Sequence, residues 1–175
     1  MSVNHQILIA GFGGQGILFS GKYLVYTGML AGHEVTWLPS YGPEMRGGTA
    51  NCSVIISEGP IGSPIVSNPN ILIVMNLPSY DKYEATVTPG GKVFVDTSLI
   101  TREAVRTDVD SYYIPATQLA LDHDLKGLAN MIMIGKVIRE TQLCSYDHIK
   151  NSMLKVVPAS KKEMLELNLK AVDIG

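Results

Sequence analysis

Three apolar runs stand out along the chain because polar residues do not alternate within them. They occupy residues 7–10, 71–75 and 93–95. Such runs are typical of strands that are buried on both faces of a parallel sheet. The first run ends at Gly11, and from Ile17 onward the apolar residues recur at helical spacing. The N-terminal segment is therefore predicted to form a strand, a tight turn and a helix.

Further elements follow from local composition. Gly32 is predicted to end the first helix, because a C-terminal cap in the left-handed backbone conformation favours glycine. Residues 34–38 are then predicted to form a second strand that ends at Pro39. Residues 49–57 are rich in β-branched side chains and are predicted as a third strand. The remaining predictions are a strand over 112–114, short helices over 77–85 and 98–105, and later helices over 117–123, 128–141, 146–156 and from Ser160 onward.

The C-terminal helices carry two further patterns. Ser160 and Glu163 have the spacing of a capping box, in which each side chain binds a free amide at the start of a helix. The segment 128–138 is apolar on more than one face, which is typical of a core helix, although one face could also meet a partner. Strands alternating with helices predict one α/β domain over residues 1–175, a three-layer Rossmann-like fold with a mostly parallel sheet and a helical C-terminal segment.

Charge is scarce in this sequence. Only 17% of the residues are charged, where about 25% is usual. The net charge is −2 with no basic block, which argues against a nucleic-acid partner, since such binding needs a lysine and arginine footprint. The low charge fits either a large core or a surface that another chain covers.

The cysteines and the lack of a recognisable targeting segment restrict further which class of protein this sequence can be. Cys52 and Cys144 are the two cysteines and lie far apart, so this chain alone is not expected to ligate an iron-sulfur cluster or another metal. No segment resembles a signal peptide or a membrane span. We therefore expect a cytoplasmic protein that binds no redox cofactor by itself.

The segment Gly11, Phe12, Gly13, Gly14, Gln15, Gly16 satisfies GxGxxG between a predicted strand and a predicted helix. The first glycine permits a tight turn and the second lets a ligand approach the backbone. The amides at the helix start can bind a phosphate or a carboxylate. Gln15 adds a side chain that both donates and accepts hydrogen bonds. The alternative is that these glycines only permit close packing of strand, turn and helix.

An NAD site also needs an acidic residue at the carboxyl end of the second strand, where it binds the ribose. Glu34 lies at the opposite end of that strand, so NAD is disfavoured.

A second glycine-bearing loop follows the second strand and is expected at the same edge of the sheet. Arg46 is a fixed cation next to Gly47 and Gly48, suited to bidentate contact with phosphate or carboxylate. Glu44 could orient this arginine, and the pair could also be an ordinary surface ion pair. The remaining loop residues form a candidate recognition surface: Ser40, Tyr41, Pro43, Glu44 and Met45.

The chain offers no arrangement of nucleophile, base and acid, so no catalytic residue is expected. Asp96 ends a strand and could be functional, yet Asp96, Thr97 and Ser98 equally form a helix-capping sequence. Cys52 is interpreted as a small core residue.

Several of these segments together resemble the gamma subunit of the 2-oxoacid:ferredoxin (acceptor) oxidoreductases. The resemblance rests on the glycine turn 11–16, residues 40–54, the loop 60–64 and residues 168–171. It spans almost the whole chain and is far more specific than GxGxxG alone.

The resemblance implies a multisubunit enzyme that converts a 2-oxoacid and coenzyme A to acyl-CoA and CO2. Thiamine diphosphate with Mg would be bound by alpha and beta partners, and iron-sulfur clusters by beta or a ferredoxin-like delta subunit. Ferredoxin or flavodoxin would accept the electrons. Within the family, residues 46–54 and the loop 60–64 resemble 2-oxoglutarate or branched-chain 2-oxoacid enzymes more than pyruvate enzymes. Of these two substrates we expect 2-oxoglutarate, with succinyl-CoA as product.

For this chain the resemblance implies a role in assembly and at the entrance of the CoA site. We expect residues 13–16 and Arg46 to contact either a CoA phosphate or the partner subunits. A different class of function, a stand-alone nucleotide-binding regulatory module, would use the same glycine turn.

Overall fold

The computed structural model describes residues 3–40, 49–102 and 105–175. The elements in chain order are β1 (Asn4–Phe12), α1 (Ile17–Leu30), β2 (Glu34–Ser40), β3 (Thr49–Ser57), β4 (Ile71–Val74), α2 (Leu77–Tyr83), the 3₁₀ turn η2 (Glu84–Thr86), β5 (Lys92–Asp96), β6 (Asp110–Ile114), α3 (Ala116–Asp122), α4 (Ala129–Thr141), α5 (Tyr146–Val156) and α6 (Lys162–Ile174). The third strand and the helix over 146–156 have the predicted bounds.

The described strands form one six-stranded sheet in the order β2-β3-β1-β4-β5-β6. The strands β1, β4, β5 and β6 pair in parallel, whereas β3 is antiparallel to both of its neighbours. The prediction of a mostly parallel sheet is confirmed. The first two strands of the chain are parallel but not adjacent, because β3 lies between them.

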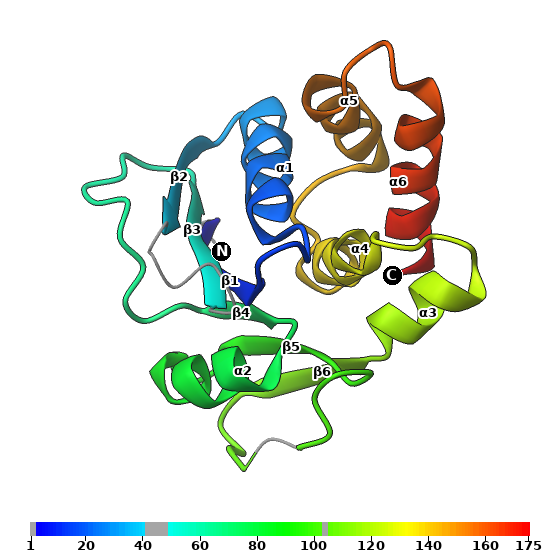
Figure 1. Cartoon of the computed structure of the whole chain (residues 1–175). Coiled ribbons are helices and arrows are strands. Elements are labelled where there is room, and N and C mark those ends of the chain that lie inside the picture. Colours follow the sequence, from blue (N-terminus) through cyan, green and yellow to red (C-terminus); the bar gives the residue numbers. More distant parts are fainter. Residues whose placement is uncertain (1–2, 41–48, 103–104) are drawn as a thin grey trace.

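Helices cover both faces of the sheet, as Figure 1 shows: α1, α3, α4, α5 and α6 lie on one side and α2 on the other. Side-chain alternation along β1 connects the sheet to both layers. Ile7 and Ile9 join the core with the larger helical layer, whereas Leu8 joins the smaller core with Tyr80 of α2. The predicted three-layer α/β architecture is confirmed.

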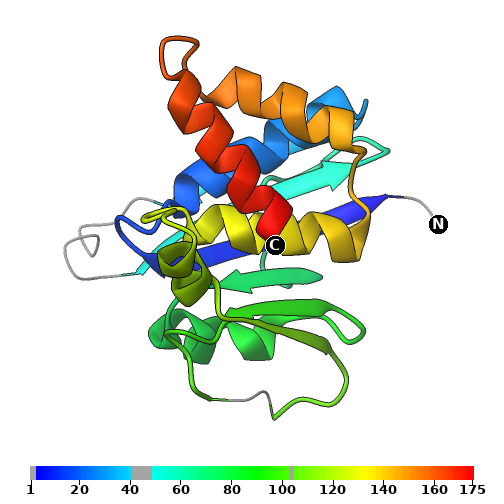
Figure 2. The ribbon, with the colours of Figure 1, turned by 90° about the vertical axis from the view of Figure 1, so that its right-hand side faces the viewer.

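Helix α4 lies at the centre of the larger layer, between the sheet and α6 (Figure 2). Both of its apolar stripes are buried within this chain. The backbone of α6 approaches so closely that a side chain at Gly135 would collide with the carbonyl of Val172. The prediction of a core helix is confirmed, and α6 packs against one of its faces.

Two local predictions are wrong. In the described part of 98–105 there is no helix, because the Asp96 carboxylate binds the Ser98 amide in a turn and the chain then extends toward Arg102. The predicted capping box also does not form. Helix α6 has Lys161 at its N-cap and no side-chain capping bond there, since the helix starts one residue later than Ser160 requires.

The predicted end of the first helix is confirmed. Gly32 has φ +85°, and His33 and Gly32 donate their backbone amides to the carbonyls of Gly28 and Met29 at 3.1 Å each. This is the pattern of a Schellman motif. No described helix is both long and apolar enough to cross a membrane.

Candidate functional site

The glycine turn, residues 11–16, connects the carboxyl end of β1 to the start of α1. The amide of Gln15 donates to the carbonyl of Phe12 at 3.2 Å and closes the turn. Gly14 and Gly16 have φ +91° and +75°, which L side chains rarely adopt. A side chain at Gly11 would meet Gln15 Oε1 at 2.6 Å, so this position needs glycine for space rather than for backbone angle.

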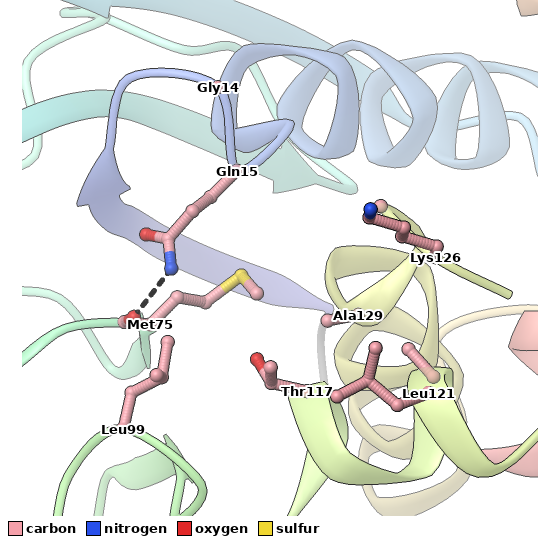
Figure 3. Close-up of a pocket in the computed structure, with 10 residues that line it drawn as sticks. Gly14, Gln15, Met75, Leu99, Thr117, Leu121, Lys126 and Ala129 are labelled. Atoms are coloured by element: carbon pink, nitrogen blue, oxygen red, sulfur yellow. Dashed lines mark hydrogen bonds between the residues drawn. The ribbon is translucent and has the colours of Figure 1, made fainter.

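The side chain of Gln15 ties the turn to the next strand. Its Oε1 accepts from the backbone amide of Phe12 at 2.6 Å, and its Nε2 donates to the carbonyl of Met75 at 2.9 Å (Figure 3). Met75 directly follows β4, so one side chain joins the ends of two neighbouring parallel strands. Gln15 thus uses part of its hydrogen-bonding capacity within the chain, and contact with a ligand stays a prediction.

Asn130 fixes the other side of the turn, and sequence reasoning missed it. Its Nδ2 donates to the carbonyl of Gly16 at 3.2 Å and to Ser20 Oγ at 3.0 Å, and the residue is only 4% exposed. A side chain at Gly16 would meet Asn130 Nδ2 at 2.5 Å. An amide side chain within the mostly apolar segment 128–138 was the available signal, because buried polar groups normally have a partner.

Two hollows flank the glycine turn. The first, here called the helix-start cavity, has a volume of about 280 Å³ and is lined by Phe12, Gly13, Gly14, Gly16, Ile17, Leu18, Phe19 and Ala50. The first helical hydrogen bond of α1 runs from the Ser20 amide to the Gly16 carbonyl at 2.9 Å. The preceding amides, from residue 17 to residue 19, have no partner within the helix and carry its positive dipole end. This geometry suits an anion.

The second hollow, here called the apolar cavity, lies on the opposite side of the turn and has a volume of about 290 Å³. Figure 3 shows Gln15 above it, Met75 and Leu99 on one side, and Thr117, Leu121 and Lys126 around the rest. The remaining lining residues are Gly14, Ala120, Gly127 and Ala129. Gly14 therefore borders both hollows.

The apolar cavity lies at a switch point of the sheet. Helix α1 leaves β1 toward one face, and α2 leaves the neighbouring β4 toward the other (Figure 1). Such divergence opens a crevice at the carboxyl ends of the two strands, which is where open α/β sheets bind ligands. The topology places the glycine turn and the cavity at the position expected of a ligand site.

Asp96 stabilises the two segments next to the apolar cavity, the turn after β5 and the start of α3. The carboxylate is fully buried, accepts from Thr117 Oγ1 at 2.6 Å and from the amides of Ser98 and Thr117 at 3.1 and 3.3 Å. It therefore caps the turn after β5 and the start of α3. Of the two interpretations of Asp96, the capping role is the one that the structure supports.

The second loop begins at the same edge of the sheet. Ser40, the last residue of β2, pairs with Asn51, which in turn pairs with Ala10 near the end of β1. Ser40 is therefore at the carboxyl end of the sheet, as predicted. The other predicted residues of this loop lie outside the described residues: Tyr41, Pro43, Glu44, Met45, Arg46, Gly47 and Gly48.

The thiol of Cys52 lies in the core, as predicted, and that of Cys144 is half-buried against it. Burial raises the pKa of Cys52 to about 12 and that of Cys144 to about 11. Cys52 lies in β3 and Cys144 between α4 and α5, and the described residues contain no group of three or more His, Cys, Asp or Glu side chains that could hold a metal ion. These residues do not fit an iron-sulfur cluster, since its ligands are thiolates.

Known proteins resemble this chain over nearly its whole length. The family model described as pyruvate ferredoxin/flavodoxin oxidoreductase matches residues 6–175. The 2-oxoglutarate synthase subunit KorC of Methanocaldococcus jannaschii is 36% identical over 166 residues, which cover 93% of this chain and 89% of KorC.

Two further matches differ from each other in the share of their own length that this chain covers. The ketoisovalerate oxidoreductase subunit VorA of Methanothermobacter thermautotrophicus is 35% identical over 173 residues, covering 97% of this chain but only 35% of VorA. This chain therefore spans about a third of the length of VorA. The solved gamma subunit of a keto/oxoacid ferredoxin oxidoreductase from Geobacter sulfurreducens has a TM-score of 0.83 and 27% identity, covering 97% of this chain and 95% of that one.

Proposed function

The chain belongs to the pyruvate ferredoxin/flavodoxin oxidoreductase family, and from this membership we propose that it is the gamma subunit of a 2-oxoglutarate:ferredoxin oxidoreductase. The assembled enzyme converts 2-oxoglutarate and CoA to succinyl-CoA and CO2, and two electrons pass to ferredoxin or flavodoxin. The match of KorC along 89% of its length is the observation that carries this proposal.

Ketoisovalerate is the second candidate substrate. VorA is 35% identical to this chain, close to the 36% of KorC. We favour 2-oxoglutarate because KorC has the slightly higher identity to this chain.

Catalysis in this proposal is divided among subunits. Thiamine diphosphate with Mg is assigned to the alpha and beta partners, and iron-sulfur clusters to beta or a delta partner. The bound thiamine supplies the carbanion chemistry of decarboxylation. The raised pKa values of the buried Cys52 and the half-buried Cys144 support this division, because a protonated thiol is not a ready ligand for iron.

We assign the glycine turn to the CoA site. Gly11 and Gly16 provide the close packing, Gly13 and Gly14 are exposed, and Gln15 connects the turn to the residue after β4. The amides at the start of α1 offer partners to a phosphate in the helix-start cavity. Arg46, Gly47 and Gly48, on the loop that leaves the sheet at the same edge, are proposed to contribute a second anion contact.

Reconstitution tests the proposed activity. Co-expression with the alpha, beta and delta chains should yield one complex, and purified complex should form succinyl-CoA from 2-oxoglutarate faster than it forms acyl-CoA from ketoisovalerate or pyruvate. Faster turnover of ketoisovalerate would move the assignment to the second candidate. A chain that elutes alone and is stabilised by a nucleotide would instead be the stand-alone module.

The CoA assignment has its own test. Arg46→Ala in the assembled enzyme should raise the KM for CoA about tenfold, because the variant loses a charge-assisted hydrogen bond to a phosphate. Arg139→Ala is the control, because this arginine is exposed on α4 and donates to the carbonyl of Asp173. An unchanged KM for CoA in an intact Arg46→Ala complex would remove Arg46 from the site.

A further inference from the structure

Charged residues are distributed unevenly along this chain. The first 80 residues contain five of them, Lys22, Glu34, Glu44, Arg46 and Glu58, whereas the remaining 95 residues contain 25. A free protein surface is normally rich in charge, and the centre of a subunit interface is depleted of it. We therefore expect a surface that a partner covers on the part of the molecule formed by the first 80 residues.

One side of β2 lacks a helical cover. Val35 and Trp37 pack against the larger core, so Thr36 and Leu38 point to the opposite side of the sheet. On that side the described helix is α2, which packs against β1 and β4 (Figure 1). The side chain of Leu38 is 39% exposed as a result.

The loop 60–65 lies over the neighbouring strand β3 on the same side of the sheet. Between the loop and the strands there is a cavity of about 300 Å³, lined by Asn4 and Gln6 of β1, Ile55 and Ser57 of β3, and five residues of the loop. None of the lining side chains is charged. The open face is defined here as the outward side of β2, with Thr36 and Leu38, together with the loop 60–65.

The loop holds one large apolar side chain in water. Pro60 and Pro64 fix the backbone on both sides of the turn. Ser63 Oγ accepts a hydrogen bond from the amide of Ile65 at 3.2 Å, and the next residue, Val66, is buried. Ile65 itself is 64% exposed. A loop that is already ordered loses little conformational entropy when a partner covers it, so Ile65 suits a contact with another chain.

Two carboxylates lie at one end of the open face. Glu34 pairs with Ser57 in the register of β2 and β3, and Glu58 is the next residue along the chain. Both glutamates are exposed, and neither forms an ion pair with any residue that the structure describes. They favour a partner with basic side chains at this end. A second copy of this chain has no lysine or arginine in the described part of the same face, so a different chain is the better complement.

We propose that the open face is the docking surface for another subunit, the one that corresponds to the part of VorA beyond the match. The partner presents apolar side chains to Leu38 and Ile65 and basic side chains to Glu34 and Glu58. This inference rests on the proposed function. The match covers 35% of VorA, whose remaining length belongs to the same polypeptide. In the proposed enzyme this chain is a separate subunit, so surface contacts must replace that covalent link.

The main test measures how much of this chain stays bound to affinity-tagged partner subunits at a fixed dilution. Ile65→Asp should lower the bound amount about tenfold, because docking would bury a carboxylate without a partner. Leu154→Asp is the matched control, since this leucine is 53% exposed on α5, outside the open face. Circular dichroism of the full chain checks that both variants are folded. Normal retention of Ile65→Asp, or an equal loss for Leu154→Asp, would overturn the proposal.

A variant on the strand tests the other part of the face. Leu38→Lys should also lower retention about tenfold, and lysine is well tolerated on edge strands. This variant decides the question if Ile65→Asp fails to fold. Normal retention of a folded Leu38→Lys chain would remove β2 from the docking surface.

Charge reversal tests the nature of the partner. The double variant Glu34→Lys with Glu58→Lys should lower retention about tenfold at low salt, and the loss should shrink as salt screens the charges. Glu166→Lys on α6 is the control, because this exposed glutamate lies outside the open face. Equal retention of the double variant and the unaltered chain at every salt concentration would contradict a basic partner.

Other outcomes separate this proposal from its alternatives. A dimer of the unaltered chain that Ile65→Asp converts to monomers, while the variant still joins the partner subunits, would assign the open face to a second copy instead. If the docking surface is wrong, the unaltered complex forms succinyl-CoA and the Ile65 and Leu38 variants are retained normally. If the proposed function is wrong, the unaltered complex forms no acyl-CoA from any 2-oxoacid tested.

Discussion

The two ends of the parallel sheet differ in how their side chains are satisfied. At the amino end, Lys92 at the start of β5 pairs with Asp110 at 3.3 Å, and Lys136 pairs with Glu140 at 2.6 Å. At the carboxyl end, four exposed apolar side chains surround the glycine turn and the apolar cavity. They are Phe12, Leu77, Leu99 and Leu121, each 40–54% exposed.

This difference is consistent with the ligand site that we propose at the carboxyl end. Ion pairs at the amino end satisfy their charges within the chain and remain compatible with water. The carboxyl end exposes apolar surface, the free amides at the start of α1 and Lys126, which has no ion-pair partner among the described residues. Covering these groups with a ligand or a subunit is energetically favourable. Substitutions at the two ends should therefore differ in their effects on stability and binding.

The largest expected effect comes from two left-handed glycines at opposite ends of α1. Gly16→Ala should lower the free energy of unfolding by about 2–4 kcal/mol, because it adds a collision with Asn130 to the backbone strain. Gly32→Ala should cost about 1 kcal/mol, since nothing lies within 4 Å of its added carbon. Urea denaturation measures both, and equal losses would contradict the role given to Asn130.

The two ends of β5 give the second comparison. Asp96→Ala should lower the free energy of unfolding by about 2–3 kcal/mol, because the amides of Ser98 and Thr117 lose their acceptor in a buried site. Lys92→Met, at the amino end of the same strand, should cost less than about 1 kcal/mol, as expected of a partly exposed ion pair. Thermal unfolding of both variants tests the order, which the reverse ranking would refute.

Gln15→Ala should have an intermediate effect on stability and a distinct effect on binding. Loss of the bonds to Phe12 and Met75 should cost about 1–2 kcal/mol of unfolding free energy. Because the turn loses its tie to β4, the KM for CoA in the assembled enzyme should rise while kcat stays constant. A lower kcat at constant KM would indicate that the turn acts on another step.

The smallest effect is expected at the amino end in acid. Hydrogen bonds from Arg106 and Lys136 lower the pKa of Asp108 and Glu140 below their ordinary values of 3.8 and 4.5. Their contribution to stability is therefore complete above those values and is lost as the pH falls through the lowered pKa. The double variant Arg106→Met with Lys136→Met should flatten the stability curve below about pH 4.5. An unchanged slope would mean that these exposed pairs contribute nothing.

Local patterns predicted most of the fold. The uninterrupted apolar runs located β4 and β5, and the β-branched segment 49–57 located β3, because burial selects such residues along a short stretch of chain. The position of Gly32 predicted the end of α1, since a left-handed residue favours glycine whatever surrounds it. The capping box failed for the opposite reason: Ser160 and Glu163 have the right spacing, but the helix begins after Lys161.

The candidate site was predicted in part. Its glycine turn was evident, because GxGxxG between strand and helix is a local motif. Asn130 and Lys126 were missed, since their contribution depends on packing α3 and α4 against a turn more than 100 residues earlier. The antiparallel insertion of β3 between β1 and β2 was likewise absent from the predictions, as strand order is a long-range property.

The sequence by itself determined the α/β class, the left-handed Gly32 and the family resemblance, because these reside in spacing and residue type along contiguous segments. Only the tertiary structure decided that the amide of Gln15 binds Met75, that Asn130 supports Gly16, and that an apolar cavity with Lys126 lies beside the turn. The physical reason is that hydrogen bonds and cavities are formed between segments distant in the chain, and their partners are chosen by packing.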